Sequence, residues 1–417
     1  MNVLLKSATV VDPKSDFHNQ TVDILIEKGA ITNIAKHIEN PKNYKEITRD
    51  NLHVSQGWFD SSVSFGEPGY EERETIENGL NTAARSGFTS VAVNPNSNPV
   101  IDSFADVSLL KMKSEQSPVN LYPIGALTKE SAGKDISEMY DMTQAGAVAF
   151  GDYQKPISDP NLLKIALLYA SNFDGLVYSF PLEKKISGLG VMNENITSTT
   201  LGLKGIPALS EDLQVARDLF ILEYTGGKLH IPTVSTKQSV ALIRAAKAKK
   251  LNVSASVAVH NLTLTDKALT EFETKYKVLP PLRIEEDNIA LIEGLKDGTI
   301  DMVTSDHNPL DTELKKVEFD FAKYGTIGLE SAFGVLGNIF STKKTISLLT
   351  AGKSRYGIES STVNIGEQAD LTLFNPNEKY TFSDADILSQ SKNAIFEGHE
   401  LKGKAYGIIA NNTLVIK

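Results

Sequence analysis

The sequence predicts an α/β protein with a closed (β/α)8 barrel and a small β-sandwich domain formed from both termini. Short apolar runs alternate with helical stretches through the middle of the chain, whereas strand-like alternation returns only at its two ends. Strands that alternate with helices pair in parallel, and eight such units over about 300 residues fit a closed barrel. An open doubly wound sheet stays the alternative.

The middle of the chain supplies eight apolar runs: Trp58–Phe65, Thr89–Asn94, Asn120–Ala126, Ala147–Phe150, Leu176–Phe180, Leu229–Val234, Val253–Val259 and Ile300–Thr304. Each has the length of a buried strand. Apolar residues at three- and four-residue spacing predict helices between them, including Glu71–Gly87, Leu213–Thr225, Thr236–Lys249 and Glu286–Asp297. Residues 54–360 are therefore predicted to form the barrel.

The two ends alternate apolar and polar residues, which is typical of strands with one buried face. The strand-like segments are Val3–Val11, Thr21–Ile34, Ala369–Phe374 and Ala405–Ile416. We expect residues 1–53 and 361–417 to form one composite β-domain. Two independent edge hairpins are the alternative.

Composition excludes several classes of function. The net charge of −10 disfavours a nucleic-acid partner, and the absence of cysteine removes disulfides and thiolate chemistry. The apolar run near the N-terminus is too short for a signal peptide, and no segment approaches the length of a membrane span. We therefore expect a cytoplasmic protein with no membrane partner.

Reactive groups of a barrel lie at the carboxyl ends of its strands, where Asp152 and Asp306 follow the fourth and eighth runs. Asp306 could serve as a base or metal ligand, or could cap the next turn. The chain has seven histidines, but none are spaced His-x-His or His-x-x-x-His. A lone barrel histidine is more often a structural residue than a ligand.

Ordered motifs along the chain carry a resemblance to a known family. They include Gly57–Asp60, Glu67–Gly69, Gly190–Asn193, Val215–Asp218, Val234–Thr236, Pro280–Arg283 and Gly328–Glu330. In this order they resemble the dihydroorotases, which are amidohydrolase-type barrel enzymes. The resemblance implies a hydrolase that opens a cyclic amide with zinc.

The same resemblance implies that the site has changed. The positions of the family's metal ligands are here Ser62, Ser64, Asp152, Ser179, Thr233 and Asp306, so four ligand histidines are replaced by hydroxyl residues. Asp306 keeps the place of the catalytic base, Asp152 that of a bridging carboxylate and Asn96 that of a substrate asparagine. Gly66, Leu279 and Leu310 replace residues that bind the substrate.

Hydroxyl groups are poor zinc ligands, so we expect no zinc unless the family's site is partly retained. The sequence resembles the inactive pseudo-dihydroorotases. It therefore predicts a non-catalytic homologue in pyrimidine biosynthesis that forms a homodimer and associates with aspartate carbamoyltransferase. An active cyclic amide hydrolase with a remodelled site and a metabolite-binding module are the alternatives.

Overall fold

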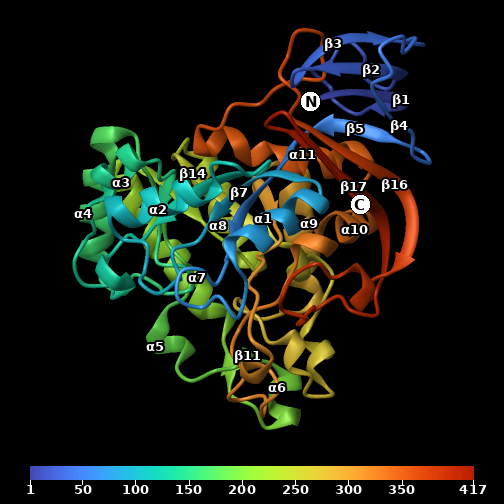
Figure 1. Cartoon of the computed structure of the whole chain (residues 1–417). Coiled ribbons are helices and arrows are strands. Elements are labelled where there is room, and N and C mark those ends of the chain that lie inside the picture. Colours follow the sequence, from blue (N-terminus) through green and yellow to red (C-terminus); the bar gives the residue numbers. More distant parts are fainter.

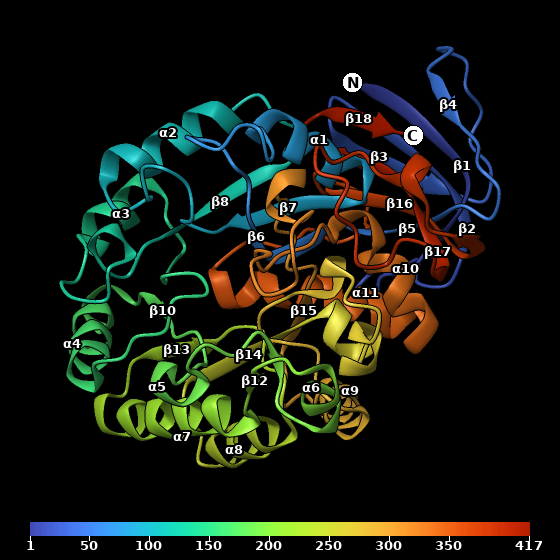
Figure 2. The same ribbon diagram turned by 90° about the horizontal axis from the view of Figure 1, so that it is seen from below.

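A ring of eight parallel strands forms the centre of the protein in the computed structural model, which describes residues 1–417 (Figures 1 and 2). Its strands are β6 (Trp58–Val63), β7 (Phe88–Val93), β8 (Asn120–Gly125), β9 (Ala149–Phe150), β10 (Leu176–Tyr178), β13 (Lys228–Ile231), β14 (Val253–Ala258) and β15 (Met302–Thr304). A parallel bridge between Val63 and His307 closes the ring. The predicted (β/α)8 barrel is confirmed.

Helices cover the outside of this ring (Figure 2). They are α1 (Ile76–Arg85), α2 (Phe104–Ser114), α3 (Met139–Ala145), α4 (Pro160–Ala170), α7 (Ala208–Thr225), α8 (Lys237–Ala248), α9 (Glu285–Asp297), α10 (Leu329–Ile339) and α11 (Thr342–Thr350). Two short helices, α5 (Lys184–Ser187) and α6 (Ile196–Leu201), lie below the barrel in the view of Figure 1. The helix predicted from Glu71 begins only at Ile76, because Thr75 caps it by accepting a hydrogen bond from the Asn78 amide. No helix combines the length and the apolar character needed to cross a membrane.

Both ends of the chain contribute to a second sheet. Its strands are β1 (Asn2–Val10), β2 (Thr21–Glu27), β3 (Ala30–Ala35), β4 (Lys45–Ile47), β5 (His53–Gln56), β16 (Leu371–Thr381), β17 (Glu400–Ala410) and β18 (Thr413–Ile416). Antiparallel pairing of β5 with β16 joins the two ends, with Val54 opposite Leu373. The two ends therefore share one sheet and are not independent hairpins. The remaining strands, β11 (Met192–Asn193) and β12 (Gly205–Ile206), pair with each other beside the barrel.

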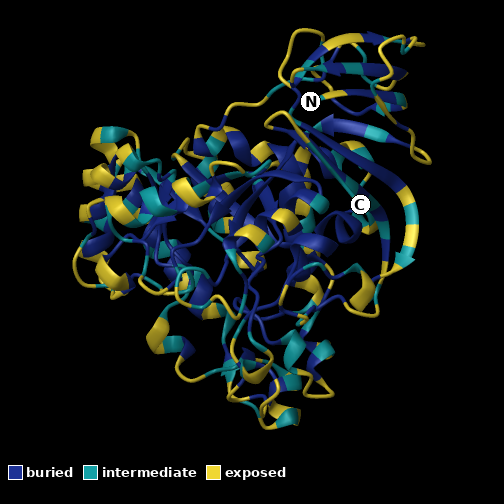
Figure 3. Ribbon diagram, in the orientation of Figure 1, coloured by how far each residue is buried: buried dark blue, intermediate teal, exposed yellow.

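The barrel interior is packed below its mouth. Phe59, Ile124, Tyr178, Met302 and Tyr356 belong to one buried cluster there, and the hydroxyl groups of the two tyrosines are hydrogen-bonded to each other. Buried residues line the strands throughout, and exposed residues lie on the outer helices and loops (Figure 3). This packing confines any site to the carboxyl ends of the strands.

Candidate functional site

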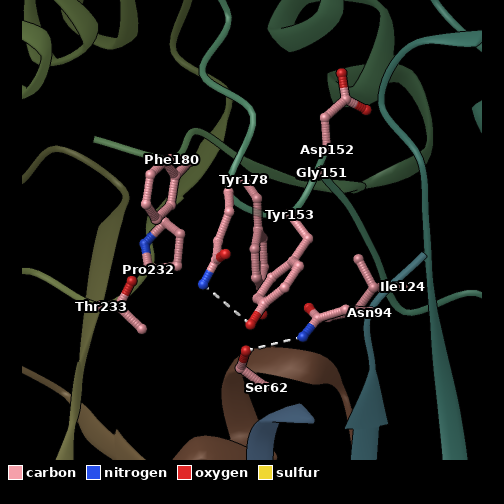
Figure 4. A pocket seen from close by; sticks show the side chains of 11 residues that line it. Ser62, Asn94, Ile124, Gly151, Asp152, Tyr153, Tyr178, Phe180, Pro232 and Thr233 are labelled. Carbon is pink, nitrogen blue, oxygen red and sulfur yellow. Dashed lines mark hydrogen bonds between the residues drawn. The ribbon is translucent and has the colours of Figure 1, made fainter. Parts of the chain in front are cut away.

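The carboxyl ends of the barrel strands enclose a cavity of about 20 Å³, which has room for about one water molecule (Figure 4). It is lined by Ser62, Asn94, Ile124, Gly151, Asp152, Tyr153, Gln154, Tyr178, Phe180, Pro232 and Thr233. Pockets that bind drug-sized molecules are typically at least 300 Å³. The centre of the barrel mouth is therefore filled by side chains.

Two serines at the end of β6 form part of a hydrogen-bonded network. The Asn94 side-chain amide donates to Ser62 Oγ at 3.0 Å and to Ser64 Oγ at 3.3 Å. Ser62 Oγ in turn donates to Asp306 Oδ1 at 3.4 Å. Both serine hydroxyl groups are thus hydrogen-bonded to other side chains of the protein, in a layer that is buried from solvent.

Asp306 is held under the cavity with a left-handed backbone, at φ +48°. Burial, and next the charge of Asp60, raise the pKa of Asp306 to about 7. The Tyr153 hydroxyl lies 3.3 Å from Asp306 Oδ1, and burial also raises the pKa of this tyrosine. The tyrosine therefore stays protonated and donates to the carboxyl group. Gln154 Nε2 fixes the ring from above by donating to Tyr153 Oη at 3.2 Å and to the Leu279 carbonyl at 3.0 Å.

The Asp152 side chain does not point into the site, where a bridging carboxylate was expected. Its carboxylate accepts hydrogen bonds from the Thr128 amide, at 3.0 Å, and from the Thr128 hydroxyl. Figure 4 shows the carboxylate pointing away from Ser62 and Tyr153. The side chain that enters the cavity from this loop is that of Tyr153, and no carboxylate from this loop reaches the cavity centre.

The end of β10 also differs from the expectation that Ser179 faces the site. Ser179 Oγ donates to Asp218 Oδ2 on α7 at 2.6 Å, so it points outwards toward the helices. Its neighbours Tyr178 and Phe180 line the cavity instead. Side chains along a strand alternate between its two faces, so adjacent residues cannot both point inwards. Phe180, not Ser179, is the cavity residue here.

The other predicted positions are divided between two places. Thr233 lines the cavity, and its amide donates to Ser256 Oγ at 3.2 Å. Asn96 lies farther out, in the wider cleft above the cavity. Its Oδ1 atom is buried without a hydrogen-bond partner.

All three barrel histidines are buried. His230 contacts the hydroxyl groups of Ser254 and Ser256 at 2.9 and 3.1 Å. His307 Nδ1 accepts from the Gly328 amide at the start of α10, at 3.2 Å. His260 has no partner for either ring nitrogen, and burial lowers its pKa to about 3. None of them lines the cavity.

Comparison with known proteins shows what this barrel is related to. A family model described as "Dihydro-orotase-like" matches residues 53–239. The chain is 41% identical to a protein named dihydroorotase from Pelotomaculum thermopropionicum, over 100% of this chain and 99% of that protein. It is 40% identical to a dihydroorotase from Acetivibrio thermocellus, with the same coverage. The chain belongs to the dihydroorotase family. Among solved structures, an L-hydantoinase from Arthrobacter aurescens has the same fold, with a TM-score of 0.86 at 20% identity over 100% of this chain and 96% of that one.

The residues present do not fit the zinc site that the family resemblance implies. Nowhere does the structure group three or more His, Cys, Asp or Glu side chains so that they could hold a metal ion. Asp306 is the one carboxyl group that accepts hydrogen bonds from the side chains of Ser62 and Tyr153. Neutral hydroxyls and an aromatic ring cannot substitute for imidazole and carboxylate ligands.

The positions that the family resemblance implies for substrate binding carry no polar side chains. A Cβ atom on Gly66 would lie 1.8 Å from the Tyr70 carbonyl oxygen, so the present backbone admits no side chain there. Leu279 is buried in a small apolar cluster with Phe180 and Ile206. Leu310 is buried beside the outer cleft. A substrate carboxylate would meet hydrocarbon at these positions.

Sequence reasoning missed Tyr153 and Phe180, which line the cavity together with Tyr178. Both are adjacent in sequence to a residue that was singled out, Asp152 or Ser179. Side chains alternate between the two faces of a strand, and Leu176 and Tyr178 lie on the apolar inner face of β10. This alternation could have predicted that Ser179 faces outwards.

Proposed function

We propose that this chain is a non-catalytic member of the dihydroorotase family that acts in pyrimidine biosynthesis as a structural partner. The observation that carries the proposal is the cavity at the barrel mouth, which has a volume of about 20 Å³ and is filled by Tyr153 and Phe180. The cavity lacks both the ligands for a metal ion and the space for a ring substrate.

The chemistry of amide hydrolysis supports this reading. Water bound to catalytic zinc has a pKa near 7, whereas bulk water has a pKa of about 15.7. Asp306 alone would have to activate an ordinary water molecule, and no group in the cavity is placed to polarise an amide carbonyl as a metal ion does. The barrel scaffold, by contrast, is complete, because its strand ring and its helices are all present.

The partner that we propose is aspartate carbamoyltransferase, which the resemblance to pseudo-dihydroorotases implies, and we propose that the chain itself is a homodimer. The test is size-exclusion chromatography with light scattering of the purified chain, alone and mixed with the transcarbamoylase of the same organism. We expect a dimer alone and a larger complex in the mixture. A chain that stays separate from the transcarbamoylase at every concentration tested would remove the partner from the proposal.

Elemental analysis tests the metal side of the proposal. Wild-type protein purified without chelator and incubated with zinc should retain less than one zinc ion per chain after dialysis. The Asp306→Asn variant should retain at least as much zinc as wild type. One tightly bound zinc ion per chain that is lost in the Asp306→Asn variant would contradict the proposal.

An active dihydroorotase with a remodelled site is the second candidate. The names of the relatives favour it, since the compared proteins that share 37 to 41% identity over the whole chain are named dihydroorotase. Asp306, buried beside Ser62, would then be the group that accepts a proton from water. Turnover of dihydroorotate to carbamoyl aspartate that is abolished by Asp306→Asn would establish this candidate.

A further inference from the structure

Two neighbouring helices of the barrel present apolar side chains to the solvent. α4, α7 and α8 follow one another around the outside of the strand ring, and α7 packs against both of its neighbours (Figure 2). The large exposed side chains of this surface, named here the α4/α7 face, are Ile165 and Leu168 on α4 and Leu209, Leu213, Phe220 and Tyr224 on α7. Single exposed apolar residues are ordinary on a protein surface, whereas a group of them on two adjoining helices forms a patch.

The helix α7 is apolar on two opposite sides. Its inner side is buried against the barrel through Val215, Leu219 and Leu222. The outward residues recur at three- and four-residue spacing, which places them in one stripe along the helix: Leu209, Leu213, Ala216, Phe220 and Tyr224. A surface helix presents polar residues to the solvent, and a helix that is apolar all round is buried. The composition of α7 therefore predicts that its outer side is covered in the assembled protein.

The helix α9 shows an ordinary solvent-facing surface on the same barrel. Its exposed residues are all charged except one isoleucine: Glu285, Glu286, Ile289, Glu293, Lys296 and Asp297. The outer side of α7 thus differs from that of a helix of similar position and comparable length. The apolar stripe is a feature of α7 and not of the barrel surface in general.

The charged residues beside the stripe already have partners within the chain. Arg217 forms an ion pair with Asp218 at 2.7 Å, and Glu223 forms one with Lys249 at 3.0 Å. The Asp212 carboxylate accepts a hydrogen bond from the hydroxyl group of Thr236 on the neighbouring segment. Burying an unpaired charge is costly, so these pairs allow the stripe to be covered at little electrostatic cost.

The α4/α7 face is large enough for a stable interface. With about 200 Å² for a fully exposed large apolar side chain, its six residues expose on the order of 700 Å². The largest apolar patch of a typical monomer is about 300–600 Å². Each partner of a standard protein–protein interface contributes about 800 Å². The face and a narrow polar rim around it would therefore supply one side of such an interface.

The same face contains a projection and a groove side by side. Phe220 and Tyr224 project from α7, being 71% and 79% exposed. Phe220 also borders a groove of about 110 Å³ between α7 and α8, whose apolar walls include Leu219, Leu242 and Leu251. An apolar cavity of about 150 Å³ can hold a benzene molecule, so this groove can accept part of an aromatic ring. Two-fold symmetry places the same surface of two copies against each other, so a ring from each copy can enter the groove of the other.

We propose that the α4/α7 face is the interface between two copies of this chain, with α7 of one copy packed against α7 of the other about a two-fold axis. A second copy is the occupant that the face favours, because the face carries both the projecting rings and the groove that receives them. The inference rests on the homodimer of the proposed function and adds the location of its interface. It does not depend on whether the chain is catalytic.

Sedimentation velocity over a dilution series tests the interface on the full-length chain. Leu213→Lys and Phe220→Lys each place a charge in the apolar stripe and change only an exposed side chain, so both should fold, which thermal unfolding checks. Each should weaken the dimer by about thirtyfold or more, the effect of losing one central interface residue. Ile289→Lys is the matched control, because it makes the same kind of change at an exposed residue of α9, and it should sediment as wild type does.

The outcomes separate this inference from the proposed function. A wild-type chain that is monomeric at every concentration would overturn both the interface and the proposed homodimer. A wild-type dimer that persists unchanged in both α7 variants would overturn the interface alone, as would equal dissociation of Ile289→Lys. If the α7 variants stay dimeric but no longer bind the transcarbamoylase of the same organism, the face belongs to that partner and the proposed second copy is wrong.

Discussion

Histidines placed at the barrel mouth test which side chains face the cavity. Two variants are compared, and both replace the Tyr153 ring by alanine so that its hydroxyl no longer contacts Asp306. Both also carry three of the histidines that the family resemblance implies, so their shared substitutions are Ser62→His, Ser64→His, Thr233→His and Tyr153→Ala. They differ in the position of the fourth histidine. One variant has Phe180→His and the other has Ser179→His. The structure predicts that only the variant with Phe180→His binds zinc.

The magnitude follows from the local packing. In the Ser179→His variant the imidazole enters a buried position beside Asp218, where overpacking costs about 1–3 kcal/mol. That histidine cannot reach the cavity, because position 179 faces α7. In the Phe180→His variant, zinc at about 100 times its dissociation constant would stabilise the fold by about 2.7 kcal/mol. With about 2.1 cal/mol/K of unfolding entropy per residue, a chain of 417 residues should then melt about 3 °C higher.

The assay is differential scanning calorimetry with and without zinc, combined with elemental analysis after dialysis. The shift should disappear on adding a chelator, and wild-type protein is the control for non-specific zinc effects. Equal zinc binding by both variants would refute the assignment of Phe180 to the inner face. A Phe180→His variant that folds and binds no zinc would show that the backbone of the mouth has moved away from a metal-binding geometry.

Two further predictions concern stability. Arg283 is 1% exposed, donates to Asn193 Oδ1 at 3.0 Å and to the Ile206 carbonyl at 2.8 Å, and lies 3.8 Å from Glu211. Arg283→Met should therefore lower the free energy of unfolding, measured in urea, by about 3–5 kcal/mol, because Glu211 is left buried and unpaired. Adding Glu211→Gln should restore part of this loss. A loss below about 1 kcal/mol in Arg283→Met would show that the ion pair is not needed for stability. Burial raises the pKa of Glu74 from 4.5 to about 7, so its contribution to stability is fully present below pH 4.5 and is lost as the pH rises toward 7, by up to about 3 kcal/mol. In Glu74→Gln the unfolding free energy should fall less between pH 5 and pH 8 than in wild type, and an identical fall in both proteins would exclude Glu74 as its cause.

The fold was predictable because its signals are local and repeated. Each apolar run predicted from the sequence overlaps a barrel strand, and a run such as Leu229–Val234 or Val253–Val259 can be recognised without knowing its neighbours. The pairing of β5 with β16 joins segments more than 300 residues apart. This pairing was suggested only by the similar strand-like patterns at the two ends, because no local sequence pattern identifies pairing partners so far apart.

The candidate site was predictable in part. The residue types at positions 62, 64 and 233 predicted hydroxyl groups where the family resemblance implies zinc ligands, and these side chains do lie at the barrel mouth. The directions of Asp152 and Ser179 were not predictable, because each depends on a partner distant in sequence: Thr128 for the first and Asp218 for the second. A register error of one residue on a strand moves a side chain to the opposite face.

Turnover of dihydroorotate by the purified protein, measured with added zinc and compared with Asp306→Asn, tests the central claim most directly. The non-catalytic proposal predicts that wild type and variant both stay at the background rate of buffer with zinc. A wild-type rate above that background that is lost in Asp306→Asn would contradict it and would show that the remodelled mouth still hydrolyses the ring.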